Sequence, residues 1–169
     1  MVPGDPARTE FAWVGGTAAP AGEAPALRVQ GMPLVKPPWG SIVAIDMNKG
    51  EILWKVANAE TPDNVRNNPA LKGLNIPRTG RASNTIGLLV TKTLLIAGEP
   101  GTFTMPDGRQ GAMLRAFDKA SGKDAGAVYM PTGQTGTPMT YMLNGKQYIV
   151  VAIGAANYPA ELVAFRLPD

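Results

Sequence analysis

The amino-acid sequence predicts an all-β fold built from β-propeller blades of four antiparallel strands. The first observation is composition, because 20 glycines and 16 prolines make up about a fifth of the 169 residues, against roughly 12 % in ordinary proteins. The second observation is a series of short apolar segments separated by turn sequences. The third is an internal repeat. Together these features favour many short strands over long helices.

Composition also excludes several chemistries. The chain has no cysteine and no histidine, so it holds no disulfide, no zinc finger and no Ser-His-Asp triad. A net charge of +3 with no run of five like charges argues against a nucleic-acid partner. No apolar run approaches the roughly 20 residues of a membrane span. The first residues lack the basic and apolar regions of a signal peptide.

The chain divides into two regions of different character. In residues 1–40, Ala, Gly and Pro supply 20 positions, which predicts a linker or loop region. From residue 41 to 169 the pattern predicts strands. Residues 41–46 and 51–56 form a hairpin around the turn at 47–50. A long polar stretch at 57–85 then predicts a loop insertion, and loops of that length are often functional.

Two further groups of strands follow the insertion. Four strands in hairpin order make one complete unit, and three strands make a partial one, with the Asn144-Gly145 dipeptide as a strong turn signal between two of them. The predicted strands are 87–91, 93–98, 112–118 and 125–130 in the first group, and 137–142, 147–153 and 161–167 in the second.

The internal repeat defines the blade. Ala44-Ile45-Asp46, with glycine four residues after the aspartate, matches Ala116-Phe117-Asp118 at an offset of 72 residues. Trp54 follows Asp46 by eight residues, whereas Gly126 stands at the corresponding place in the second copy. Aspartate suits the turn because it accepts backbone N–H bonds, and glycine suits a position with positive φ. A third, partial copy is Ala164-Phe165-Arg166.

These units amount to half a blade, one whole blade and three quarters of a blade. A closed ring needs about four to eight blades, so we expect a C-terminal segment of a larger propeller. The last strand would then come from the N-terminal part of the complete protein. We also expect the isolated chain to be poorly stable and to self-associate through its unpaired strand edges.

The repeat and its neighbouring blocks resemble the pyrroloquinoline quinone (PQQ)-dependent dehydrogenases, which are eight-bladed propellers, and most closely their glucose dehydrogenase-like branch. The resemblance covers roughly residues 33–169. It rests on Pro37-Pro38-Trp39-Gly40, on residues 44–54 and 114–123, and most specifically on Thr137-Pro138-Met139-Thr140-Tyr141 with residues 145–152.

The resemblance implies an oxidoreductase that oxidises a glucose-like sugar or an alcohol by hydride transfer to the quinone. It implies PQQ and calcium as cofactors, a quinone or cytochrome as electron acceptor, and a periplasmic location. No motif in this chain matches the family's catalytic aspartate or calcium ligands, so these are expected in the rest of the propeller. The repeat Trp of the family docks against the next blade, and Trp54 fits that role.

Four residues are candidates for cofactor binding. Arg78, Arg81 and Asn84 precede the predicted inner strand at 87–91, where the entering loop lies at a mouth of the central channel. Arginine can bind the carboxylates of the cofactor through two hydrogen bonds. Trp39 could line the same mouth. The alternative for this cluster is a solvated loop anchored by surface charges.

Two other functions stay open. The chain could belong to a non-catalytic propeller that acts as a protein-interaction scaffold, like the lipoprotein propeller of the outer-membrane assembly machinery. It could also be an inactive, truncated gene product. A stable protein partner without quinone binding would favour the scaffold.

Overall fold

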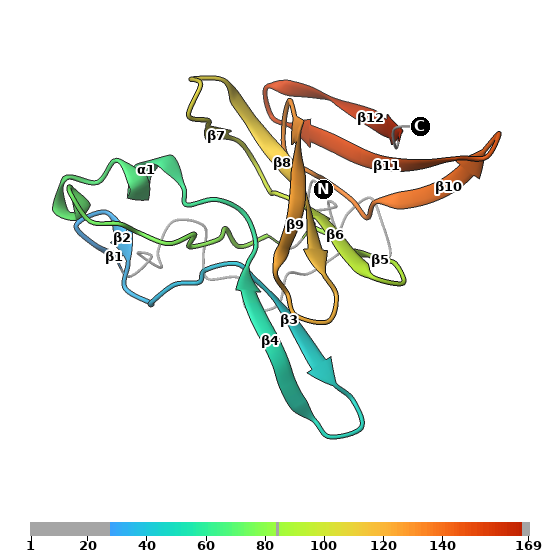
Figure 1. Ribbon diagram of the computed structural model, residues 1–169. Coiled ribbons are helices and arrows are strands. Elements are labelled where there is room, and N and C mark those ends of the chain that lie inside the picture. Colours follow the sequence, from blue (N-terminus) through green and yellow to red (C-terminus); the bar gives the residue numbers. More distant parts are fainter. Residues whose placement is uncertain (1–27, 84, 167–169) are drawn as a thin grey trace, which may run out of the picture. The chain divides into compact units, whose positions relative to one another are not determined.

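The computed structural model describes residues 28–83 and 85–166, in a chain that forms two compact units, residues 1–34 and 35–169. In the first unit the described residues form a small hairpin of β1 (Arg28–Val29) and β2 (Met32–Pro33) (Figure 1). Most of the predicted linker region lies outside the described residues, so its division from residues 41–169 stays a prediction.

The second unit begins with the predicted hairpin of β3 (Ser41–Asp46) and β4 (Glu51–Ala57). Oδ1 of Asp46 accepts hydrogen bonds from the backbone N–H groups of Asn48 and Lys49, at 2.9 and 3.2 Å. Gly50 closes the turn with a φ of +71°. The turn therefore has the chemistry expected from the Asp-x-x-x-Gly pattern.

The second sheet is the complete blade that the sequence predicted. Its antiparallel order is β5 (Leu89–Val90), β6 (Leu94–Gly98), β8 (Gln110–Asp118) and β9 (Asp124–Met130). A short extra strand, β7 (Phe103–Thr104), pairs with the beginning of β8 and was not predicted. The third sheet has three antiparallel strands in the order β10 (Met139–Leu143), β11 (Lys146–Ala155) and β12 (Tyr158–Arg166).

The two larger sheets pack against each other through a core of buried aliphatic residues, which includes Leu114, Met130, Val151 and Ile153. Gln134, in the link between the two sheets, is only 2 % exposed. Its Oε1 accepts a bond from Gly98 N at 2.6 Å, and its Nε2 donates to Gly87 O at 2.8 Å and to Gly136 O. The buried side-chain amide of Gln134 thus links the end of β6 to the backbone just before β5 and just before β10.

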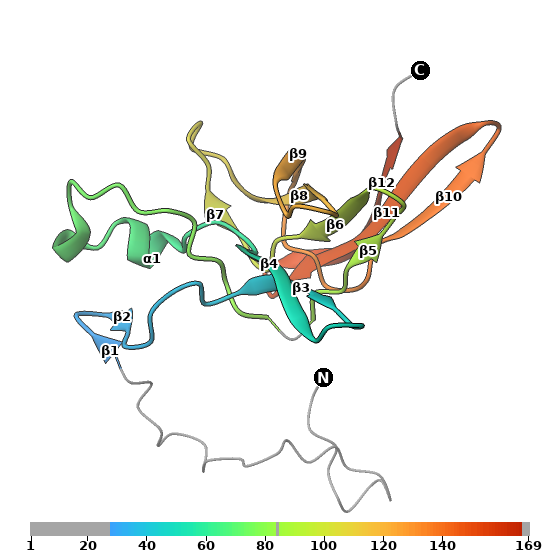
Figure 2. The same ribbon diagram turned by 60° about the horizontal axis from the view of Figure 1, so that its bottom comes forward.

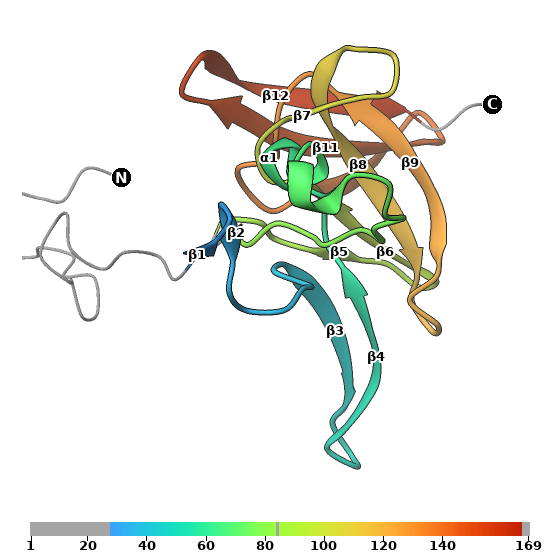
Figure 3. The same ribbon diagram turned by 90° about the vertical axis from the view of Figure 1, so that its left-hand side faces the viewer.

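Trp54 joins the first hairpin to the complete blade. Its indole Nε1 donates to Lys119 O at 3.0 Å, and its ring lies so close to Gly122 that a Cβ there would be 2.7 Å from Cδ2. Figure 3 shows the β3–β4 hairpin beside the turn between β8 and β9. The predicted docking of Trp54 against the next blade is confirmed.

Gly126 occupies the place of Trp54 in the second blade. Ala44 pairs with Trp54 and Ala116 pairs with Gly126, and each pair is followed by a register shift. Tyr129 does not substitute for the tryptophan, because its hydroxyl donates to Gln110 O within the same blade. The second interface therefore depends on aliphatic packing.

A long segment with little regular structure connects β4 to β5. It contains the single-turn helix α1 (Asp63–Arg66) and the 3₁₀ turn η1 (Pro69–Leu71). In Figures 1 and 2, α1 and the β10–β12 sheet lie on opposite sides of the complete blade. The segment therefore lies on the side of the blade away from β10–β12, where Leu95, Ala97 and Phe117 also pack against Ile42, Trp54 and Val56 of the first hairpin.

Candidate functional site

The candidate site begins where three segments of the chain cross. Asn58 N donates to Gly40 O at 3.0 Å, Arg81 N donates to Asn58 O at 2.9 Å, and Trp39 N donates to Thr79 O at 2.7 Å. A Cβ on Gly40 or on Gly80 would lie 2.1 Å from a backbone oxygen, Arg81 O or Gly40 O respectively. Only glycine allows these segments to approach so closely, and the contact fixes their relative positions.

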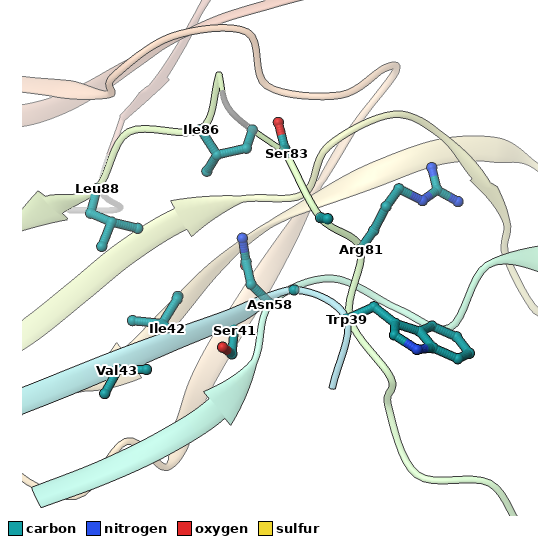
Figure 4. Close-up of a pocket in the computed structure, with 11 residues that line it drawn as sticks. Trp39, Ser41, Ile42, Val43, Asn58, Arg81, Ser83, Ile86 and Leu88 are labelled. Carbon is teal, nitrogen blue, oxygen red and sulfur yellow. The ribbon is translucent and has the colours of Figure 1, made fainter. Parts of the chain in front are cut away.

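A cavity of about 350 Å³ opens beside this crossing. Its walls combine aliphatic side chains with hydroxyl and amide groups (Figure 4). Its lining includes Ser41, Ile42, Asn58, Ser83, Ile86 and Leu88. This volume lies within the usual range of roughly 300–1,000 Å³ for small-molecule sites.

Trp39 and Arg81 both line this cavity, so the structure brings these two predicted residues together. Their side chains, however, extend away from Ile86 and Leu88 in Figure 4. Nη1 of Arg81 donates to Pro100 O and Thr102 O at 3.1 and 3.0 Å. Arg81 therefore holds the turn after β6, and its predicted role toward a cofactor stays a prediction.

Arg78 does not join them. Nη2 of Arg78 pairs with Asp124 Oδ2 at the beginning of β9. Arg78 lines a different hollow from Arg81, together with Glu60 and Arg66. Asn84 lies outside the described residues.

Asn58 is the polar residue at this cavity that sequence reasoning missed. It directly follows β4 and is 7 % exposed. In Figure 4 its amide nitrogen points toward the hollow that Ile42, Ile86 and Ser83 surround, and its Oδ1 has no hydrogen-bond partner among the described residues. The only sequence signal was an asparagine at a strand end, which is common in turns.

A chain of charged groups lies on the blade face beneath the long segment. Arg115 of β8 donates through Nε to Glu99 Oε1 and through Nη2 to Glu60 Oε1, each at 2.6 Å. Glu60 also accepts from Arg66 at 3.4 Å. Glu99 is 1 % exposed, and this burial raises the pKa of its carboxyl group, although Arg115 opposes the rise. The charges pair internally and hold the segment on the blade.

Metal ligands are scarce in this part of the molecule. Among residues 28–83 and 85–166, no three Asp or Glu side chains come together in a way that could hold an ion. In the same residues, no helix is long and apolar enough to cross a membrane.

Comparison with known proteins identifies the family. The model of the PQQ "Glucose/ethanol/alcohol dehydrogenase, beta-propeller domain" matches residues 4–149. Quinoprotein glucose dehydrogenase A of Acinetobacter calcoaceticus is 31 % identical over 82 % of the chain and 16 % of its own length. Quinate/shikimate dehydrogenase (quinone) of Acinetobacter baylyi is 32 % identical over 75 % of the chain and 15 % of its own length. A 1-butanol dehydrogenase (cytochrome c) of Thauera butanivorans is 39 % identical over 37 % of the chain and 8 % of its own length.

The antiparallel four-stranded blade, its partial neighbours and the docked tryptophan define a segment of a β-propeller. The chain belongs to the PQQ-dependent dehydrogenase family, and the predicted fold class and family are confirmed. It spans about one sixth of the length of the first two relatives.

Proposed function

We propose that the chain forms the C-terminal blades of a PQQ-dependent dehydrogenase that oxidises a glucose-like sugar or an alcohol. The observation that carries this proposal is the match of residues 4–149 to the quinoprotein propeller family, in a chain whose described strands form propeller blades. The names of the relatives support both substrate classes, since they include a glucose, a quinate/shikimate and a 1-butanol dehydrogenase.

The cavity meets the needs of the cofactor only in part, because Nη1 of Arg81, the one cationic side chain in its lining, donates to two backbone carbonyls. PQQ is a flat, fused ring system with three carboxylates, so it needs apolar contact for the rings and hydrogen-bond donors for the oxygens. Ile42, Ile86 and Leu88 provide the apolar wall, and the Asn58 amide faces the hollow. When bound, the cofactor supplies the hydride acceptor for the substrate carbon. The residues of this chain would form part of the wall beside it.

The rest of the propeller would supply the base and the calcium ligands. We propose a periplasmic location for the protein, with a quinone or a cytochrome as electron acceptor. The relatives' names include both kinds of acceptor.

The direct test is reconstitution of the full-length polypeptide that carries this chain. Apoprotein is loaded with PQQ and calcium, and dye reduction is measured with glucose, quinate and 1-butanol in separate assays. We expect cofactor absorbance in the purified protein and turnover with at least one substrate. Absence of both would refute the proposal.

A non-catalytic scaffold is the second candidate. It is favoured by the contacts of Arg78 and Arg81, since both side chains hold loops in place. For this function, affinity purification would recover a stoichiometric protein partner, and equilibrium dialysis would show no PQQ binding.

A further inference from the structure

The strongest unassigned feature is a second cavity, of about 480 Å³, between the complete blade and the segment that follows β4. We call it the blade cavity. Its lining includes Glu60, Arg66, Phe103, Met105, Met113 and Arg115. Nη1 of Arg66 donates to Thr104 O at 3.2 Å, so α1 is attached to β7 beside the cavity. The lining thus comes from the complete blade and this segment, and not from the open edge of β3.

The apolar part of the wall can hold a flat ring. Phe103 and Met105 are 7 % and 8 % exposed, so most of each side chain is already packed in the fold. The guanidinium group of Arg66 lies 5.8 Å from the centre of the Phe103 ring. Methionine side chains adapt their shape to a ligand, and their sulfur atoms make favourable contacts with aromatic rings. Met105 and Met113 therefore suit the blade cavity to an aromatic ligand.

Arg115 presents one hydrogen-bond donor to the blade cavity. Its Nε donates to Glu99 Oε1 and its Nη2 to Glu60 Oε1, each at 2.6 Å, so the plane of the guanidinium group is fixed. Its Nη1 has no hydrogen-bond partner among the described residues, yet the fold does not shield this atom from solvent. The side chain is only 13 % exposed and lines the cavity, so a ligand reaches Nη1 from there. A donor that is already in position loses little conformational freedom on binding.

The charges around this donor disfavour a charged ligand. Two carboxylates, of Glu60 and Glu99, balance the two guanidinium groups of Arg66 and Arg115. A carboxylate on Nη1 of Arg115 would lie beside the Glu60 carboxylate on Nη2 of the same group, and the two like charges would repel each other. An ammonium group would meet the same repulsion from the two arginines. The ligand that fits is uncharged and carries a hydrogen-bond acceptor.

We propose that the blade cavity binds a small, uncharged aromatic compound whose carbonyl oxygen accepts a hydrogen bond from Arg115 Nη1. The ring lies against Met105 and Met113. The inference is independent of the proposed function, because the lining of the blade cavity shares no residue with the cavity beside Gly40.

The test uses the full-length polypeptide that carries the chain and three probes of similar size. Acetophenone has the ring and the carbonyl group, α-methylstyrene has a CH₂ group in place of the carbonyl oxygen, and benzoate carries a charge. Dissociation constants are measured by ligand-observed NMR titration, with and without PQQ. We expect saturable binding of acetophenone that is about 10-fold tighter than that of either other probe, the effect of one hydrogen bond to a charged group. Added PQQ should leave these constants unchanged, so failure of the proposed function would not alter the result.

Two variants assign the binding to the blade cavity. Met113→Trp fills part of the space and should abolish saturable binding, whereas Met47→Trp, at a side chain that is 86 % exposed, is the matched control. Arg115→Lys keeps the charge but offers one ammonium group, which its carboxylate partners occupy, so the preference for acetophenone over α-methylstyrene should disappear. Arg109→Lys, at an exposed arginine, should keep that preference. Far-ultraviolet circular dichroism checks that each variant is folded, and the comparison of the three probes needs no variant.

Four results would overturn the inference. They are no saturable binding of acetophenone, equal or tighter binding of α-methylstyrene or benzoate, unchanged acetophenone binding in Met113→Trp, and a preference for acetophenone that survives in folded Arg115→Lys.

Discussion

Replacing the glycine beneath Trp54 measures how strongly the first hairpin is fastened to the complete blade. Gly50 and Gly122 end equivalent turns, and both have a φ of +71°. A Cβ on Gly50 would meet nothing within 4 Å, whereas one on Gly122 would lie 2.7 and 2.8 Å from two ring carbons of Trp54. Alanine at either position carries the backbone cost of the left-handed conformation, about 1–2 kcal/mol. At Gly122 the overlap with the ring adds about 1–3 kcal/mol.

We therefore expect Gly50→Ala to lower the free energy of unfolding by about 1–2 kcal/mol and Gly122→Ala by about 2–5 kcal/mol. In a Trp54→Ala background the overlap is gone, so Gly122→Ala should cost no more than Gly50→Ala. Urea unfolding followed by far-ultraviolet circular dichroism, arranged as a double-mutant cycle, gives the coupling energy. Equal costs for the two glycines, or a coupling below about 0.5 kcal/mol, would refute the docking argument.

Three further perturbations test other contacts. Burial raises the pKa of Glu99 above its ordinary 4.5, so the protein should lose stability as the pH rises from that value through the raised pKa. Glu99→Gln should lack this loss when the melting temperatures of the two proteins are compared across pH. A difference in melting temperature that does not change with pH would contradict this role of Glu99. Hydrogen bonds from Ser121 lower the pKa of Asp118 below 3.8. Asp118→Asn should therefore be less stable at neutral pH and lose its disadvantage as the pH falls below that value. Gln134→Leu removes the side-chain partner of Gly98 N and Gly87 O, whereas Gly136 O keeps its bond from Gly87 N. The substitution should cost about 2 kcal/mol or more in urea unfolding; an unchanged midpoint would show that these bonds contribute little.

The sequence predicted the blades well because their signals are local. The Asp-x-x-x-Gly turns, the alternating apolar residues and the Asn144-Gly145 turn each act over a few residues, and β3, β4 and the later strands lie within a few residues of their predicted bounds. β7 escaped prediction because it has only two residues and owes its pairing to β8. No periodic pattern exists in so short a strand.

The candidate site was harder to predict because its contacts join distant segments. Arg78 and Arg81 are three positions apart in the sequence, yet one pairs with Asp124 and the other holds the turn at 100–102. Arginine is suited both to a ligand carboxylate and to a carbonyl of the fold, and only tertiary structure distinguishes the two uses. Asn58 was missed for the same reason, since its burial depends on Gly40 and Arg81.

The attachments of the segment between β4 and β5 explain why a stretch with so little regular structure has a defined course. A loop of this length loses much conformational entropy when it is ordered, so it needs specific contacts to hold it. The polar contacts that fasten it to the complete blade include three made by its acidic and basic side chains: Glu60 with Arg115, Asp63 with the backbone N–H and hydroxyl of Thr104, and Arg78 with Asp124. All three come before Arg81, Ala82, Ser83, Ile86 and Leu88, which line the cavity. Glu60, Asp63 and Arg78 thus help to position the chain that forms this cavity wall, while the predicted role of Arg78 and Arg81 toward a cofactor stays a prediction.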